Sequence, residues 1–92
     1  MKHLNITVSG KVQGVYFRAA TKAVADQLGI KGFALNKADG TVYIEAEAAT
    51  WLLESFIEWC HEGPDRATVE KVESMEAEIA GFTDFIIKKD AG

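Results

Sequence analysis

One short stretch of the 92-residue chain carries residue types that could bind a small anion. Gly10 and Gly14 lie between an alternating segment and a segment of helical period, and Arg18 follows in the first helical turn. N–H groups in such a loop can converge on an anion, and a helix N-terminus adds free donors and a positive dipole end. The positive charge of Arg18 is unfavourable beside the positive end of the helix dipole. Binding of an anion by its guanidinium would explain why an arginine stands at this position. On spacing alone the alternative is slightly favoured: the glycines only make a turn and Arg18 points into solvent.

Asn36 is the second candidate side chain. It has the opposite parity to Phe33 and Leu35 in a short apolar run, just before the turn signal Asp39-Gly40. An amide offers both a donor and an acceptor, so it could hold a water molecule by two bonds. Without further context, the alternative that Asn36 caps the turn is favoured.

The other titratable residues form no recognisable catalytic or metal-binding set. We expect His3 and His61 at the surface and Cys60 in the core. Two histidines and one cysteine are too few for a typical structural zinc site. The glutamates of the last third are expected to form a solvated strand face; they are Glu70, Glu73, Glu76 and Glu78.

Hydrophobic periodicity assigns these residues to elements. Alternation predicts strands with one buried face, whereas apolar spacings of three and four predict helices. Glycines and Asp39-Gly40 mark the boundaries. The predicted order is a strand at 4–9, a helix at 17–28, strands at 32–36 and 42–47, a helix that Thr50 caps and Gly63-Pro64 ends, a bent strand at 69–77 and a last strand at 82–88.

The order β-α-β-β-α-β predicts an α+β, ferredoxin-like split βαβ sandwich in a single domain, residues 1–92. Two helices would cover one face of an antiparallel sheet of four to five strands, and the last strand would extend or follow the fourth. This fold carries many functions, so it does not decide between them.

Composition excludes several classes of protein. With 48% hydrophobic and 26% charged residues, the chain has the balance of an ordinary globular domain and not of a disordered tail. It lacks an apolar run of 18 residues and a signal-peptide core, so we expect no membrane partner and a cytoplasmic location. The net charge of −4 argues against nucleic acid as the main partner, although residues 1–40 carry six basic and two acidic side chains.

Two long motifs resemble the signatures of the acylphosphatase family. Residues 8–18, VSGKVQGVYFR, are similar to the first signature, and residues 32–42, GFALNKADGTV, are similar to the second. Gly63-Pro64 and the ending at 85–88, FIIK, also fit, so the resemblance covers nearly the whole chain. The chain departs from the family pattern at Leu35, where a polar or basic residue is usual, and at Ala48, where glycine is usual; neither is a catalytic position.

The resemblance implies an enzyme that hydrolyses small acyl phosphates to a carboxylate and inorganic phosphate. It implies that Arg18 binds the phosphate and that Asn36 positions the attacking water. It also implies a monomer without metal or cofactor. The N–H groups that would cradle the phosphate belong to Gln13, Gly14, Val15, Tyr16, Phe17 and Arg18.

Two other functions use the same fold. A non-catalytic phosphate-binding or regulatory module would bind the anion without turnover. An RNA-binding domain would need paired aromatic residues on its central strands and a basic sheet face. The polar face of the first strand is Asn5, Thr7 and Ser9, and the net charge is negative, so RNA binding ranks a distant third.

Overall fold

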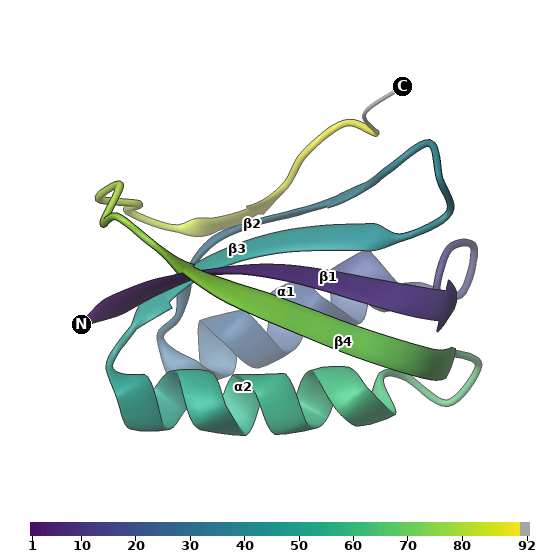
Figure 1. The fold of residues 1–92 in the computed structure, drawn as a ribbon, viewed down its shortest axis with the longest axis horizontal. Helices are drawn as coiled ribbons and strands as arrows, with labels where there is room; N and C mark the ends of the chain where they lie inside the picture. The colour runs from purple at the N-terminus through teal and green to yellow at the C-terminus, as the bar shows by residue number, and fades with distance from the viewer. Residues whose placement is uncertain (91–92) are drawn as a thin grey trace.

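The computed structural model describes residues 1–90 and shows two helices covering one face of a five-stranded sheet (Figure 1). The strands lie side by side in the order β4-β1-β3-β2-β5. The predicted split βαβ fold is therefore confirmed. The elements are β1 (Lys2–Lys11), α1 (Phe17–Leu28), β2 (Lys31–Asn36), β3 (Val42–Ala48), α2 (Thr50–Glu62), β4 (Thr68–Ala77) and β5 (Phe85–Ile87).

The sheet is antiparallel except at one edge, where β5 pairs parallel with β2. The reason lies in the connections. β4 runs antiparallel to β1, β1 to β3 and β3 to β2, so β4 and β2 point in opposite directions. A strand that follows β4 through a short connection starts where β4 ends and runs back. β5 must therefore run in the same direction as β2, and the sheet is mixed rather than wholly antiparallel.

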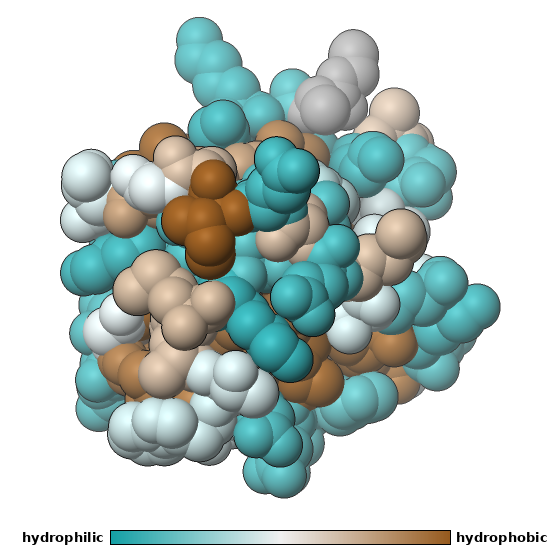
Figure 2. Space-filling view, turned by 60° about the vertical axis from the view of Figure 1, so that its left-hand side comes forward, coloured by the Kyte–Doolittle hydropathy of each residue, from teal (hydrophilic) through white to brown (hydrophobic). Residues whose placement is uncertain are grey.

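Large apolar side chains at the surface are few. The face in Figure 2 shows them as small groups among hydrophilic residues, an ordinary arrangement for a small protein. Within residues 1–90, neither helix has the length and apolar character needed to cross a membrane. The largest exposed apolar side chains are Met1, Tyr16, Trp51, Met75, Ile79, Ile86 and Ile87.

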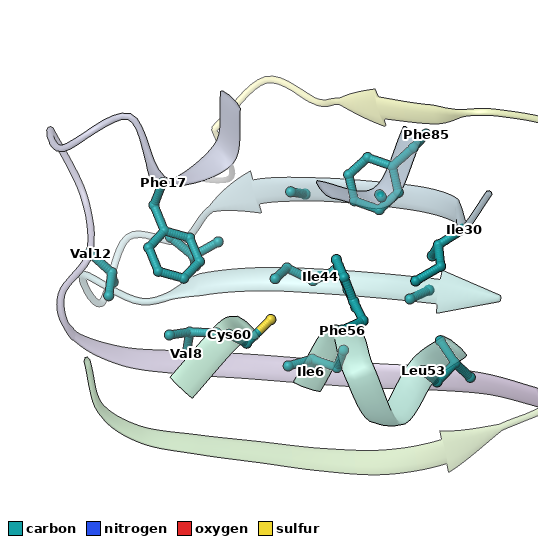
Figure 3. Close-up of a cluster of buried hydrophobic side chains, with 14 of the residues drawn as sticks. Ile6, Val8, Val12, Phe17, Ile30, Ile44, Leu53, Phe56, Cys60 and Phe85 are labelled. Atoms are coloured by element: carbon teal, nitrogen blue, oxygen red, sulfur yellow. The ribbon is translucent and has the colours of Figure 1, made fainter. Parts of the chain in front are cut away.

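The core lies between the sheet and the two helices (Figure 3). Alternate residues of the central strands, such as Ile6 and Ile44, point toward the helices and are fully buried. Phe56 and Cys60 come from the apolar stripe of α2. The prediction that Cys60 is a core residue is confirmed, and burial raises the pKa of its thiol to about 12.

The helix ends show one correct and one wrong prediction. Gly29 ends α1 in the left-handed region, and its N–H donates to the carbonyls of Ala25 and Asp26. The prediction that Thr50 caps α2 is wrong, because Thr50 is already its first helical residue. The cap is Ala49, whose carbonyl accepts the N–H groups of Leu52 (3.0 Å) and Leu53 (3.1 Å).

The bend predicted in the fourth strand is present as a β-bulge. Ser9 pairs with Lys71, whereas Gly10 pairs with Val69, so one residue of β4 is left over. Gly10 has a φ of 126°, and a Cβ there would collide with the carbonyl of Thr68. A glycine is thus required where β1 runs toward the loop before α1.

His3 contradicts the prediction of a surface residue, because it is only 3% exposed. Its Nε2 lies 2.8 Å from Glu45 Oε1, and its Nδ1 lies 2.9 Å from Glu47 Oε2. Of these two contacts, the one between Nε2 and Glu45 is a hydrogen bond. The segment after β4 covers the ring, and Phe82 packs on it with centroids 5.4 Å apart. The strand pattern could not show burial that a distant loop provides.

Glu47 holds that covering segment in place. Its carboxylate accepts the backbone N–H groups of Ala80, Gly81 (3.0 Å) and Phe82 (3.0 Å). The last strand pairs with β2 only from Phe85 beside Gly32 onward, so it begins at Phe85 and the predicted strand at 82–88 is too long. Burial alone would raise the pKa of Glu47, but these N–H donors and His3 outweigh it and hold the pKa below its usual 4.5.

We expect Glu47→Gln to lower the free energy of unfolding by about 1–3 kcal/mol at neutral pH, because it removes charge-assisted hydrogen bonds. A depressed folded-state pKa adds stability that is full above the unfolded value and is lost as the pH falls through the folded value. The difference in the free energy of unfolding between wild type and variant should therefore become smaller below pH 4.5. Urea unfolding across pH checks this, with the exposed Glu70→Gln as control. A difference that is independent of pH would contradict it.

Candidate active site

A pocket of about 350 Å³ opens where the β1–α1 loop, the first turn of α1, the end of β2 and β5 meet. The loop and the β2–β3 turn lie at the same end of the molecule, on the right in Figure 1. The lining residues are Val12, Gly14, Tyr16, Phe17, Arg18, Ala19, Asn36 and Ile87.

The N-terminus of α1 at this pocket has no side-chain cap. Tyr16 occupies the cap position in the left-handed region, with φ 61° and ψ 24°, and the first turn contains no acidic residue. This conformation costs a non-glycine residue about 1–2 kcal/mol, and it replaces the usual Ser, Thr, Asp or Asn cap. The positive dipole end of α1 and its first N–H groups therefore remain available to the pocket.

The loop before α1 also keeps its N–H groups free of internal pairing. None of the N–H groups from Gln13 to Arg18 donates to a backbone carbonyl within residues 1–90. The first regular helical bond runs from the N–H of Ala20 to the carbonyl of Tyr16, at 3.0 Å. Gly14, with a φ of 74°, lets the chain turn here. Such a run of unpaired donors beside a helix end is suited to binding an anion.

Gln13 fixes the loop against the β2–β3 turn. Its Nε2 donates to the carbonyls of Lys37 (2.8 Å) and Thr41 (2.9 Å). The turn is itself braced by Asp39, whose carboxylate accepts the N–H and hydroxyl of Thr41. The sequence analysis considered only the backbone of Gln13 and missed this side-chain role. A lone glutamine in a loop carries no signal of its partners.

The six predicted cradle residues divide into two groups. Gly14, Tyr16, Phe17 and Arg18 line the pocket, but Gln13 and Val15 do not. The side chain of Val15 is 5% exposed and belongs to the core, and the side chain of Gln13 faces the turn. For Gln13 and Val15, only the backbone could take part in anion binding.

The two predicted side chains, Arg18 and Asn36, meet in this pocket although they are 18 residues apart in the chain. Asn36 shares the helix-facing side of β2 with Ala34 and is 8% exposed. Its Oδ1 is buried without a hydrogen-bond partner within residues 1–90. An unpaired buried amide oxygen is costly unless it meets a donor, so it points to a ligand or a bound water.

The C-terminal segment contributes residues that the sequence analysis did not predict for the site. Ile87 of β5 lines the pocket, and Asp90 Oδ1 lies 2.7 Å from Arg18 Nη1. Their positions depend on how β5 pairs with β2, and no local pattern shows that. Within residues 1–90, no three His, Cys, Asp or Glu side chains are grouped as metal ligands.

Comparison with known proteins identifies the family. The family model for acylphosphatase matches residues 4–87. The chain belongs to the acylphosphatase family. An acylphosphatase of Marinobacter nauticus is 49% identical over 82 residues, which cover 88% of this chain and 89% of that protein. The predicted family and the prediction of an acylphosphatase-type enzyme are therefore confirmed.

Solved acylphosphatase structures share the fold over almost the whole chain. That of Bacillus subtilis superposes with a TM-score of 0.93 at 34% identity, covering 96% of this chain and 99% of that one. That of Coxiella burnetii gives 0.92 at 33% identity, covering 95% and 92%.

Both departures from the acylphosphatase signatures lie outside the pocket lining. Leu35 is half-buried on the sheet face opposite to Asn36, in register with Tyr43. Ala48 is buried at the end of β3, where it pairs with Lys2. Neither side chain contacts the space between Arg18 and Asn36, so the pocket keeps its residue set despite the two changes.

Gln13→Ala should destabilise this member of the acylphosphatase family by about 1–2 kcal/mol, because two carbonyl groups lose their donor. The measurement is the free energy of unfolding in urea. Gln27→Ala, at an exposed position of α1, is the matched control. Equal stability of the two variants would show that the Gln13 amide does not fix the loop.

Proposed function

We propose that the chain hydrolyses small acyl phosphates to a carboxylate and inorganic phosphate. The observation that carries the proposal is the meeting of Arg18 and Asn36, whose Oδ1 has no partner within residues 1–90, beside the uncapped N-terminus of α1. A non-catalytic module would bind the anion without turnover, so a measurement of activity distinguishes the two functions. The membership of the acylphosphatase family supports the same substrate class.

The phosphoryl end of the substrate would lie at the N-terminus of α1. The N–H groups of the loop from Gln13 to Arg18 would donate to its oxygens, and the guanidinium of Arg18 would add a planar pair of charged donors. The backbone donors would be held in place by the fold before the substrate arrives. They would therefore stabilise the charge that develops on the phosphoryl group during bond breaking at little reorganisation cost.

Asn36 would position the nucleophile. Its side-chain amide lines the same pocket as Arg18, and an amide can hold a water molecule as donor or acceptor, so Asn36 would hold the attacking water for an approach opposite the leaving group. The water oxygen forms the new bond to phosphorus while the bond between phosphorus and the acyl oxygen breaks. The electron pair of the broken bond leaves on the carboxylate.

Within residues 1–90, the pocket lining includes no carboxylate or histidine, and Asp90 at its mouth is paired with Arg18, so a phosphoryl oxygen would take the proton of the water. The carboxylate is a good leaving group and needs no protonation. The protein's contribution would then consist of positioning and charge stabilisation.

Hydrolysis of benzoyl phosphate, followed by its ultraviolet absorbance, tests the proposal. Arg18→Ala should lower kcat/KM by more than about a hundredfold, as should Arg18→Lys, since an ammonium lacks the planar fork. Asn36→Ala should lower kcat at least about tenfold and leave phosphate affinity nearly unchanged. The controls are Arg66→Ala and Asn5→Ala, at positions outside the pocket. Full activity of Arg18→Ala, or no turnover by a folded wild type, would refute the proposal.

Chelation tests the proposed independence from metal. Because positioned donors and a good leaving group suffice for this mechanism, prolonged treatment with EDTA should leave the rate unchanged. Loss of activity that a divalent cation restores would contradict the mechanism.

A further inference from the structure

Arg18 is not free in this structure, although it is the only side-chain cation of the pocket lining. Asp90 Oδ1 accepts a hydrogen bond from Arg18 Nη1 at 2.7 Å. No other carboxylate within residues 1–90 forms an ion pair with Arg18. The side chains of Arg18 and Asp90 are 32% and 59% exposed, so the pair lies at the mouth of the pocket and not in the core.

The pairing of the last strand brings Asp90 to this place. β5 runs parallel to β2, with Phe85 beside Gly32 and Ile87 beside Ala34. The N–H of Lys88 continues the ladder by donating to the carbonyl of Ala34 at 2.9 Å. The chain therefore leaves β5 toward the end of β2 that carries Asn36. An antiparallel β5 would have carried Asp90 to the opposite end of the sheet.

We propose that the Asp90 carboxylate is an internal competitor of phosphate: it occupies the Arg18 guanidinium in the empty site and must be displaced when an anion binds. The proposal rests on the phosphate site proposed above. A carboxylate is a planar anion that uses the same guanidinium donors as a phosphoryl group. Its negative charge beside the pocket would also oppose a second anion until it moves away.

The exposure of the pair sets the size of the effect. Exposed ion pairs are worth at most about 1 kcal/mol, so the paired state is populated about one to five times as much as the open one. An anion that binds only the open state loses apparent affinity by the inverse of the open fraction. The competition should therefore weaken phosphate binding by about two- to sixfold. It would also return a carboxylate to Arg18 as product phosphate leaves.

The test measures the dissociation constant of inorganic phosphate by titration of the full chain. Asp90→Asn keeps the shape but removes the charge, and should lower the dissociation constant by about two- to sixfold. Asp65→Asn is the matched control: it makes the same change of net charge at an exposed loop position without an ion pair to Arg18. It should bind phosphate like the wild type. In an Arg18→Ala background, the effect of Asp90→Asn should be smaller than in the wild type, because only the direct repulsion between Asp90 and the anion remains.

Equal affinity of Asp90→Asn and Asp65→Asn would overturn the proposal. Weaker binding by Asp90→Asn would also overturn it, because Asp90 would then orient Arg18 and not compete for it. Phosphate binding without turnover of benzoyl phosphate would refute the proposed hydrolysis but leave this test valid. Absence of phosphate binding in wild type and Asp90→Asn alike would refute both.

Discussion

The uncapped N-terminus of α1 is the constraint on which the rest of this molecule depends. A helix end normally pairs its first N–H groups with a side chain, and here the left-handed Tyr16 leaves them open instead. The left-handed conformation costs free energy, and contacts in the surrounding structure must offset this cost. Gly10 lets β1 pass close to β4, Gly14 lets the chain turn, and Gln13 fastens the loop to the β2–β3 turn.

The remaining elements bring two distant side chains to that helix end. The antiparallel pair β2 and β3 places Asn36 on the helix-facing side at the end of a strand, and the core under α1 fixes the position of Arg18. The face of the sheet away from the helices also contributes to the site. The cluster of His3, Glu45 and Glu47 holds the segment that leads into β5, and β5 delivers Ile87 and Asp90 to the pocket. Both faces of the sheet thus contribute to one site.

The residues of the site could be predicted from the sequence to a large extent, for reasons that differ from residue to residue. Parity placed Asn36 apart from Leu35, and the change from period two to helical period placed Arg18 in a first turn. Those patterns alone did not exclude that Arg18 points into solvent and that Asn36 only caps the turn. Only the two long signatures favoured phosphate binding. The roles of Arg18 and Asn36 stay predictions until activity is measured.

What the sequence did not reveal depends on contacts between distant segments. His3 is buried because the segment at Ala80 to Phe82 folds over it, and Glu47 accepts the N–H groups of that segment. The parallel pairing of β5 follows from the order of all other strands. Asp90 reaches Arg18 only as a result of that pairing. Contacts between such distant segments cannot be predicted from the local pattern of residues.

The central claim is that backbone N–H groups of the β1–α1 loop and α1 bind a phosphoryl group together with Arg18, next to Asn36. A titration of the isotope-labelled protein with inorganic phosphate, followed by amide and side-chain NMR shifts, tests it most directly. The predicted result is a saturable set of shifts confined to the amides of residues 13–19, the Arg18 guanidinium, the Asn36 amide and the segment around Asp90. Saturable shifts centred elsewhere on the molecule, with this loop unaffected, would contradict the claim.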